Sequence, residues 1–174
     1  MKSLVLVLVA ALALSSMANA QWQKDKNYAG VNVGLSGVGS TLTFGADYER
    51  DVYDLSGGAG SIGVGGLFNY WSYDFTALVG TSGFSYRYIT LGVTGSYHLA
   101  LPDKKWDPFA GLVIGYYIVN VKTPTGTFTF AFDSNRAFFG FQGGVRYFFS
   151  PNVAAQARVG FGAYILAVGV DFSF

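Results

Sequence analysis

Apolar and polar residues alternate one by one along most of the chain beyond residue 28. Successive side chains of a β-strand point to opposite faces, so this period of two predicts strands with one apolar and one polar face. Glycine, serine, threonine and asparagine fill most of the polar positions. Seven stretches show the pattern: 29–36, 41–49, 61–70, 90–99, 139–149, 153–160 and 166–174.

An eighth strand is predicted over 109–121, where both faces are apolar and the pattern leaves open which side chains point inward. A transmembrane helix is not expected, because no segment beyond the first 20 residues offers 18 consecutive apolar residues. Bacterial membrane barrels have an even number of strands and no open edge. We therefore predict an all-β fold, an eight-stranded antiparallel up-and-down transmembrane β-barrel.

The size of the side chains distinguishes this fold from a soluble, lipocalin-like barrel with an apolar lumen. The polar face is rich in glycine and small residues, whereas the apolar face carries Phe, Tyr, Leu and Val. Eight strands leave little room inside for more than packed side chains. The large apolar face is therefore predicted to point outward. A Gly-x-Trp near the first strand, as lipocalins tend to have, is missing.

The first 20 residues have the three parts of a secretory signal. Lys2 supplies the basic start, residues 4–14 form an apolar run, and Ala18-Asn19-Ala20 is a small-residue cleavage site. The apolar run is too short to span a membrane. We expect cleavage after Ala20, which leaves 21–174 as an exported barrel domain.

The connections indicate which end of the barrel faces the periplasm. Short turns are expected on the periplasmic side at 102–107 and 150–152, and longer outer loops at 74–83 and 122–134. These outer loops are candidates for contact with a surface partner. The segment 51–60 is an exception, since it predicts a long connection on the inner side.

The last residues resemble the C-terminal strand by which outer-membrane barrels are recognised for assembly. Phe172 and Phe174 end a run with apolar residues at every second place. The stretches LGVTGSYHL (91–99) and WDPFAGLVIGYY (106–117) likewise resemble the small OmpA/OmpX-like outer-membrane barrel family. The resemblance implies the outer membrane of a Gram-negative-type bacterium, with membrane lipid and the barrel-assembly machinery as partners. It specifies the fold much better than the function.

Six ionisable residues are predicted to face the lumen. Charges in a narrow lumen are costly unless they pair, so we expect a structural network of ion pairs; a proton or ion pathway is the alternative. The six residues are Asp47, Glu49, His98, Arg146, Arg158 and Asp171.

Five outward aromatic residues are expected near the periplasmic ends of their strands. Amphipathic rings prefer the membrane interface, which predicts an aromatic girdle rather than a carbohydrate-stacking surface. They are Tyr48, Tyr97, Trp106, Tyr147 and Phe149.

Composition narrows the chemistry further. Lys and Arg number 11 against 10 Asp and Glu, which gives no basic surface for nucleic acid. One histidine and no cysteine leave no metal-ligand spacing, and the glycine strings lack the lysine of a phosphate-binding loop, so no cofactor is expected. Ser96 and His98 share a face, but both point to the lumen and lack an identifiable acidic partner.

We therefore predict a structural or surface-interaction barrel with a side-chain-filled lumen and no enzymatic activity. A narrow porin-like channel or a small-solute-binding barrel is the alternative, and a lipid-modifying enzyme is the third hypothesis.

Overall fold

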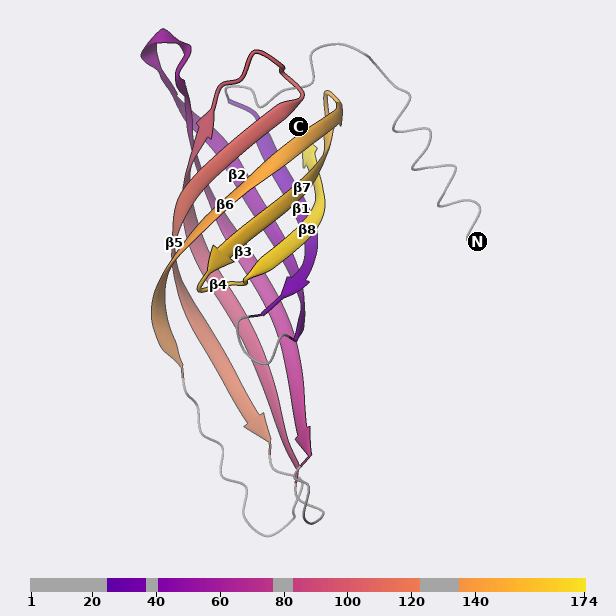
Figure 1. Cartoon of the computed structure of the whole chain (residues 1–174). Coiled ribbons are helices and arrows are strands. Elements are labelled where there is room, and N and C mark those ends of the chain that lie inside the picture. The colour runs from indigo at the N-terminus through magenta and orange to yellow at the C-terminus, as the bar shows by residue number, and fades with distance from the viewer. Residues whose placement is uncertain (1–24, 37–40, 77–82, 123–134) are drawn as a thin grey trace, which may run out of the picture.

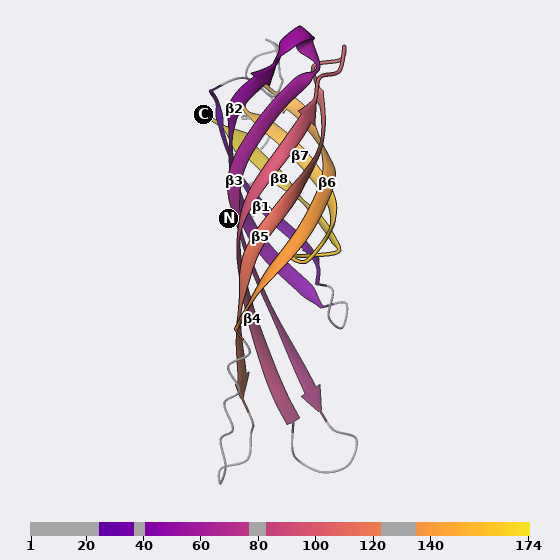
Figure 2. The same cartoon turned by 90° about the vertical axis from the view of Figure 1, so that its left-hand side faces the viewer.

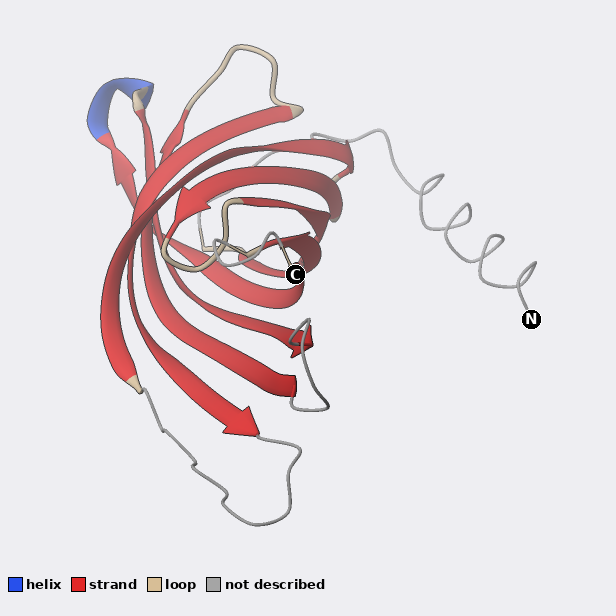
Figure 3. Cartoon of the chain, turned by 60° about the horizontal axis from the view of Figure 1, so that its bottom comes forward, coloured by secondary structure: helices blue, strands red, loops and turns tan. Residues whose placement is uncertain are grey.

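The computed structural model describes residues 25–36, 41–76, 83–122 and 135–174, which form one closed barrel of eight antiparallel strands (Figure 1). Each strand pairs with its neighbours in the chain, and β1 closes the ring by pairing with β8. The tilted view in Figure 3 shows the strands curving round a common axis. The strands are β1 (Asn27–Leu35), β2 (Leu42–Leu55), β3 (Gly60–Thr76), β4 (Gly83–Leu99), β5 (Trp106–Lys122), β6 (Arg136–Ser150), β7 (Val153–Phe161) and β8 (Leu166–Ser173).

The two faces of the sheet have the predicted orientation. Outward positions carry exposed apolar side chains, such as Val31 (60% exposed) and Phe161 (65%), while inward positions carry buried polar ones such as Asn69 and Thr90. A soluble protein would bury the large apolar residues instead. Within the described part of the chain, no helix is long and apolar enough to cross a membrane.

The structure also orients β5, for which the sequence pattern was ambiguous. Asp107, Phe109 and Val113 point into the lumen and are buried, whereas Leu112 and Ile114 are exposed on the outer wall. This strand carries apolar residues on both faces because its inner face packs against other lumen side chains. One of its inward residues is nevertheless a carboxylate.

The barrel wall is uneven in height. We call the end with Phe174 and the turn at 151–152 the inner end, and the opposite end the outer end. At the outer end, β3, β4 and β5, of 17 residues each, continue beyond β1, β7 and β8, of nine, nine and eight (Figures 1 and 2).

The predicted outer loop at 74–83 is too long. Strand pairing continues through Asp74↔Ser85 to Thr76↔Gly83, because the antiparallel ladder does not require a regular apolar and polar alternation once the strands leave the membrane. The other predicted loop, 122–134, also loses Lys122 to β5. Residues 77–82 and 123–134 lie outside the described residues.

The predicted long inner connection at 51–60 is wrong as well. β2 continues to Leu55 and pairs with β3 as far as Leu55↔Gly60, after a register shift between Asp51 and Tyr53. A single 3₁₀ turn, Ser56–Gly58, closes this hairpin. Gly57 and Gly58 have φ of 81° and 72°, which non-glycine residues rarely adopt. The extra residue at the bulge hides the strand pattern from the sequence.

The interior contains two apolar clusters and a group of ionisable side chains. Near the inner end, Tyr28, Phe148 and Ala154 form a small apolar cluster. Toward the outer end, a second apolar cluster contains Leu67, Val113, Ala163, Tyr164 and Ala167. The ionisable side chains lie on the inner side of the second cluster. Glu49 is level with Tyr28, and His98 and Asp107 line a pocket at the inner end.

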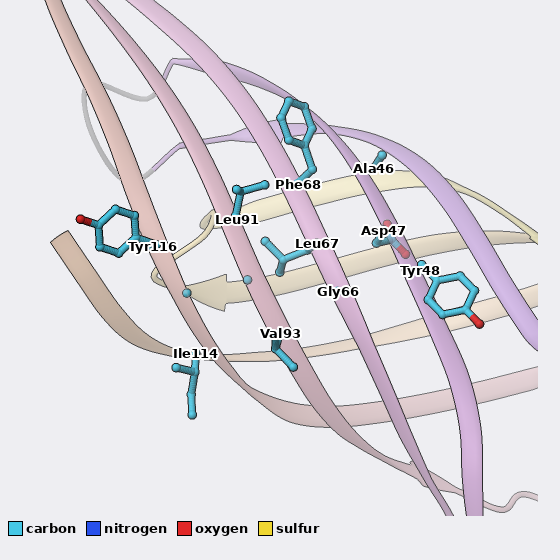
Figure 4. Close-up of a pocket in the computed structure, with 12 residues that line it drawn as sticks. Ala46, Asp47, Tyr48, Gly66, Leu67, Phe68, Leu91, Val93, Ile114 and Tyr116 are labelled. Carbon is cyan, nitrogen blue, oxygen red and sulfur yellow. The ribbon is translucent and has the colours of Figure 1, made fainter. Parts of the chain in front are cut away.

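The outer wall has a hollow of about 690 Å³ over β2–β5, shown in Figure 4. Its floor includes Gly66, and its sides are outward residues such as Phe68, Val93 and Tyr116. The hollow arises where glycine interrupts an apolar surface. Its lining fits a surface that faces hydrocarbon.

Candidate functional site

Arg146 of β6 is the centre of the lumen network and is completely buried. Its Nε donates to Asp171 Oδ2 at 2.5 Å, its Nη2 to Glu49 Oε2 at 2.6 Å, and its Nη1 to Asp107 Oδ2 at 3.2 Å. The three carboxylates come from β8, β2 and β5. One guanidinium therefore ties together strands on different sides of the barrel, which suits its planar set of donors.

A second guanidinium, from Arg158 of β7, extends the network. Its Nη2 donates to Asp47 Oδ2 at 2.5 Å and lies 4.0 Å from Asp171 Oδ1. Gln156 Nε2 links the same two carboxylates, at 2.8 Å from Asp171 Oδ1 and 3.3 Å from Asp47 Oδ1. Asn32 also donates to Asp47 Oδ1, at 2.9 Å.

His98 of β4 lies between two of the carboxylates that bind Arg146. Its Nδ1 is 2.8 Å from Asp107 Oδ1, and its Nε2 is 3.4 Å from Glu49 Oε1. The structure thus brings all six ionisable residues selected from the sequence into one buried cluster.

The arrangement does not suit a serine hydrolase. Both ring nitrogens of His98 face carboxylates, and Ser96 Oγ accepts from Gln142 Nε2 at 3.5 Å. A hydrolase would need one ring nitrogen to take the proton of the serine hydroxyl. Asp107 holds the place of an acidic partner, but it also binds Arg146.

Besides Gln156 and Asn32, two members of the network on β5 were missed by sequence reasoning. Asp107 bridges His98 and Arg146. Phe109 packs under the cations: the Arg146 and Arg158 guanidinium carbons lie 4.8 and 5.5 Å from its ring centre, and the His98 ring is 5.5 Å away. Gly111 and Gly115 lie two and six places after Phe109 and therefore share its face of the strand. Because glycine is common on the inward face, these two residues could have indicated that Phe109 and Asp107 point inward.

Gly30 makes room for the network. It pairs directly with Asp47 on one side and Asp171 on the other. A Cβ at this position would stand 2.0 Å from Asp171 Oδ1 and 2.8 Å from Gln156 Nε2. These two atoms are hydrogen-bonded to each other, and Asp171 is also held by Arg146 through its other oxygen, so the position excludes any larger side chain.

This cluster places ion pairs in the lumen. Burying charges is costly, and removing one partner of a buried pair typically costs about 3–5 kcal/mol. A pathway for solutes would require these pairs to separate together. Among the described residues, no group of His, Asp or Glu is arranged to hold a metal ion.

The five aromatic residues predicted to form a girdle all lie on the outer wall toward the inner end. Trp106 and Tyr147 have ring centres 4.7 Å apart, and Phe149 is 5.5 Å from Tyr147. The hydroxyls of Tyr48 and Tyr97 instead bind Asn27 Oδ1 at 2.7 Å and the Ala59 carbonyl at 2.6 Å.

The C-terminal residues lie at the seam that closes the barrel. Phe172 and Phe174 are exposed on the outer wall. The backbone of Phe174 exchanges hydrogen bonds of 3.1 and 3.0 Å with that of Asn27. Both phenylalanine rings are therefore available to a partner in the membrane.

Comparison with known proteins identifies the family. The model for the outer membrane protein beta-barrel domain matches residues 6–171. The chain belongs to this outer-membrane β-barrel family. It is accordingly an integral protein of the outer membrane of a Gram-negative bacterium, as the resemblance predicted. A comparison with curated protein sequences finds no significant match.

Solved structures agree on the fold. The N-terminal β-barrel domain of Pseudomonas aeruginosa OprF matches with a TM-score of 0.56 at 14% identity, covering 87% of this chain and 98% of that one. Ail, the attachment invasion locus protein of Yersinia pestis, in complex with the heparin analogue sucrose octasulfate, matches with 0.56 at 13%, covering 87% and 100%. Neisserial surface protein A matches with 0.54 at 17%, covering 86% and 95%.

Proposed function

We propose that this outer-membrane barrel is a closed, non-enzymatic protein with a structural or surface-interaction role. The observation that carries the proposal is the binding of Arg146 by three carboxylates from three strands in the middle of the lumen. An apolar cluster that includes Leu67, Val113 and Tyr164 lies on the outer side of this network and supports a lumen without a continuous polar path.

The uneven wall supports a role at the cell surface. β3, β4 and β5 extend past the short strands at the outer end. A protruding β-ribbon can offer its edge or its loops to a partner. Ail, one of the similar structures, is named for attachment and was solved with a heparin analogue.

A conductance measurement tests the closed lumen. Wild-type protein in a planar lipid bilayer is expected to give no steady current, whereas Arg146→Ala removes the central cation and is expected to leak as water enters. Arg87→Ala, on an exposed residue of β4, is the matched control and should remain silent. A large, steady wild-type current would contradict the proposal and favour the narrow-channel alternative.

The surface role needs a cellular test. A deletion strain is expected to lose adhesion or serum resistance while its lipid composition, followed by mass spectrometry, stays unchanged. A shift in lipid acylation that returns to normal on complementation would favour the lipid-modifying enzyme instead.

A further inference from the structure

A second cavity, of about 530 Å³, lies at the outer end and is separate from the ion-pair network. Its inner side consists of aromatic side chains that point into the lumen, and its outer side includes Phe139, Phe161 and Ile165 of the outer wall. The cavity is therefore continuous with the surface that faces lipid. Its volume lies in the range of ordinary ligand sites.

The aromatic lining is rigid and prearranged. Trp71 and Tyr88 stack with ring centres 3.9 Å apart and an interplanar angle of 6°. Tyr117 and Phe138 stack at 4.4 Å and 24°. The Tyr117 hydroxyl donates to the carbonyl of Gly162 in the turn between β7 and β8. Two stacked pairs thus form apolar walls.

The cavity opens above the β7–β8 turn, where the barrel wall is low because β7 and β8 are short. β7 has nine residues. At roughly 3.3 Å per residue and a tilt of about 40°, such a strand climbs about 23 Å, slightly less than the apolar band of about 25 Å. The opening therefore faces the hydrocarbon of the outer leaflet or its boundary with the headgroups.

The positive charge of Arg136 restricts which ligand can occupy the cavity. Of the described residues that line the cavity, Arg136 is the only charged one. Its guanidinium carbon lies 5.6 Å from the Tyr117 ring centre and its side chain is exposed. An occupant with an apolar tail and an acidic headgroup matches both parts of the site.

We propose that an acidic lipid of the outer leaflet inserts one acyl chain into this cavity over the β7–β8 turn, with its headgroup at Arg136. Tail entry displaces no ion pair, because the network lies deeper in the lumen. Binding of this lipid does not require the barrel to conduct ions or solutes.

Trp71 provides a direct reporter, because it lines the cavity and its side chain is buried. Replacing Trp22 and Trp106 with Phe leaves Trp71 as the sole tryptophan. This protein is refolded into zwitterionic phospholipid vesicles that contain about one-tenth brominated-chain phosphatidylglycerol or, for comparison, brominated-chain phosphatidylcholine. Bromine quenches tryptophan fluorescence at short range, and folding is verified by heat-modifiable gel migration.

We expect the acidic brominated lipid to quench at least twice the fraction of Trp71 fluorescence that the zwitterionic lipid quenches. Arg136→Gln should abolish this preference, whereas Arg87→Gln, outside the cavity, should retain it. Ala163→Leu, which fills the cavity from the turn, should lower quenching by both lipids. Two results would overturn the proposal. One is that the two lipids quench equally and Ala163→Leu does not change the quenching. The other is that Arg136→Gln and Arg87→Gln lose the preference for the acidic lipid to the same extent.

Discussion

Arg146 shows how one residue can hold a small barrel together. Its guanidinium binds carboxylates of β2, β5 and β8 and rests on the Phe109 ring. Each contact alone resembles an ordinary charged hydrogen bond, but the four groups share one buried space. The contacts therefore depend on one another. Removing the cation leaves three carboxylates close together with only His98 and Arg158 nearby to offset their charge.

Arg146→Ala is expected to lower the free energy of unfolding by about 3–5 kcal/mol, because it removes the partner of buried charges. Arg87→Ala, on an exposed side chain, should change it by about 0–1 kcal/mol. Urea unfolding of protein refolded in lipid vesicles measures both. Equal stability of the two variants would show that the buried pairs contribute no more than surface charge.

Gly30→Ala is expected to disturb the same network from the backbone side. The added methyl group would clash with the carboxylate of Asp171, and overpacking of this kind typically costs about 1–3 kcal/mol. Gly95→Ala is the matched control, since nothing lies within 4 Å of the added carbon. Thermal or urea unfolding should separate the two, and a Gly30→Ala protein as stable as Gly95→Ala would contradict the tight fit.

At the scale of the strands, the sequence predicted most where the two faces differ in chemistry. The alternation in β1, β2, β6, β7 and β8 is sufficient to decide which residues point inward. β5 lacks this contrast, since Phe109 and Val113 face the lumen as apolar groups. Asp107 was not assigned to the cluster because it was predicted to lie in the turn 102–107, whereas β5 begins at Trp106. Strand extension past the membrane was also hidden, because pairing there depends on the partner backbone rather than on burial.

We expect Phe174, the residue that follows β8, to affect assembly more than stability. Phe174→Asp is expected to reduce the amount of membrane-inserted protein in cells by several-fold, because the outward ring is lost from the proposed recognition strand. In detergent or vesicles the cost should be about 1 kcal/mol or less, since charges near the interface are tolerated there. Heat-modifiable gel bands from cell membranes and from refolding measure the two effects.

Equal cellular yields of wild type and Phe174→Asp would remove the assembly role from this residue. Phe149→Asp, which places the same charge on the outer wall near the inner end, is the matched control for a general effect of charge. It should reduce insertion in cells no more than it reduces refolding.

For the whole molecule, the main feature is the separation of functions along the barrel axis. The inner half of the lumen contains the ion pairs, and the outer half contains the aromatic cavity, which opens over the low wall. The long strands β3, β4 and β5 rise on the other side of that opening. A ligand at the outer end can therefore bind without disturbing the groups that keep the barrel closed.

The buried charges do not balance, and this has a consequence for any current that passes once the network is opened. Among the described ionisable side chains of the buried network and its inner end, the carboxylates of Asp47, Glu49, Asp51, Asp107 and Asp171 outnumber the guanidinium groups of Arg146 and Arg158 together with the His98 ring. Fixed negative charge in a narrow space attracts counter-ions of the opposite sign. The leak through Arg146→Ala should therefore be selective for potassium over chloride, and its reversal potential in a salt gradient should shift toward the potassium equilibrium value. A shift toward chloride would mean that the ions pass outside the lumen.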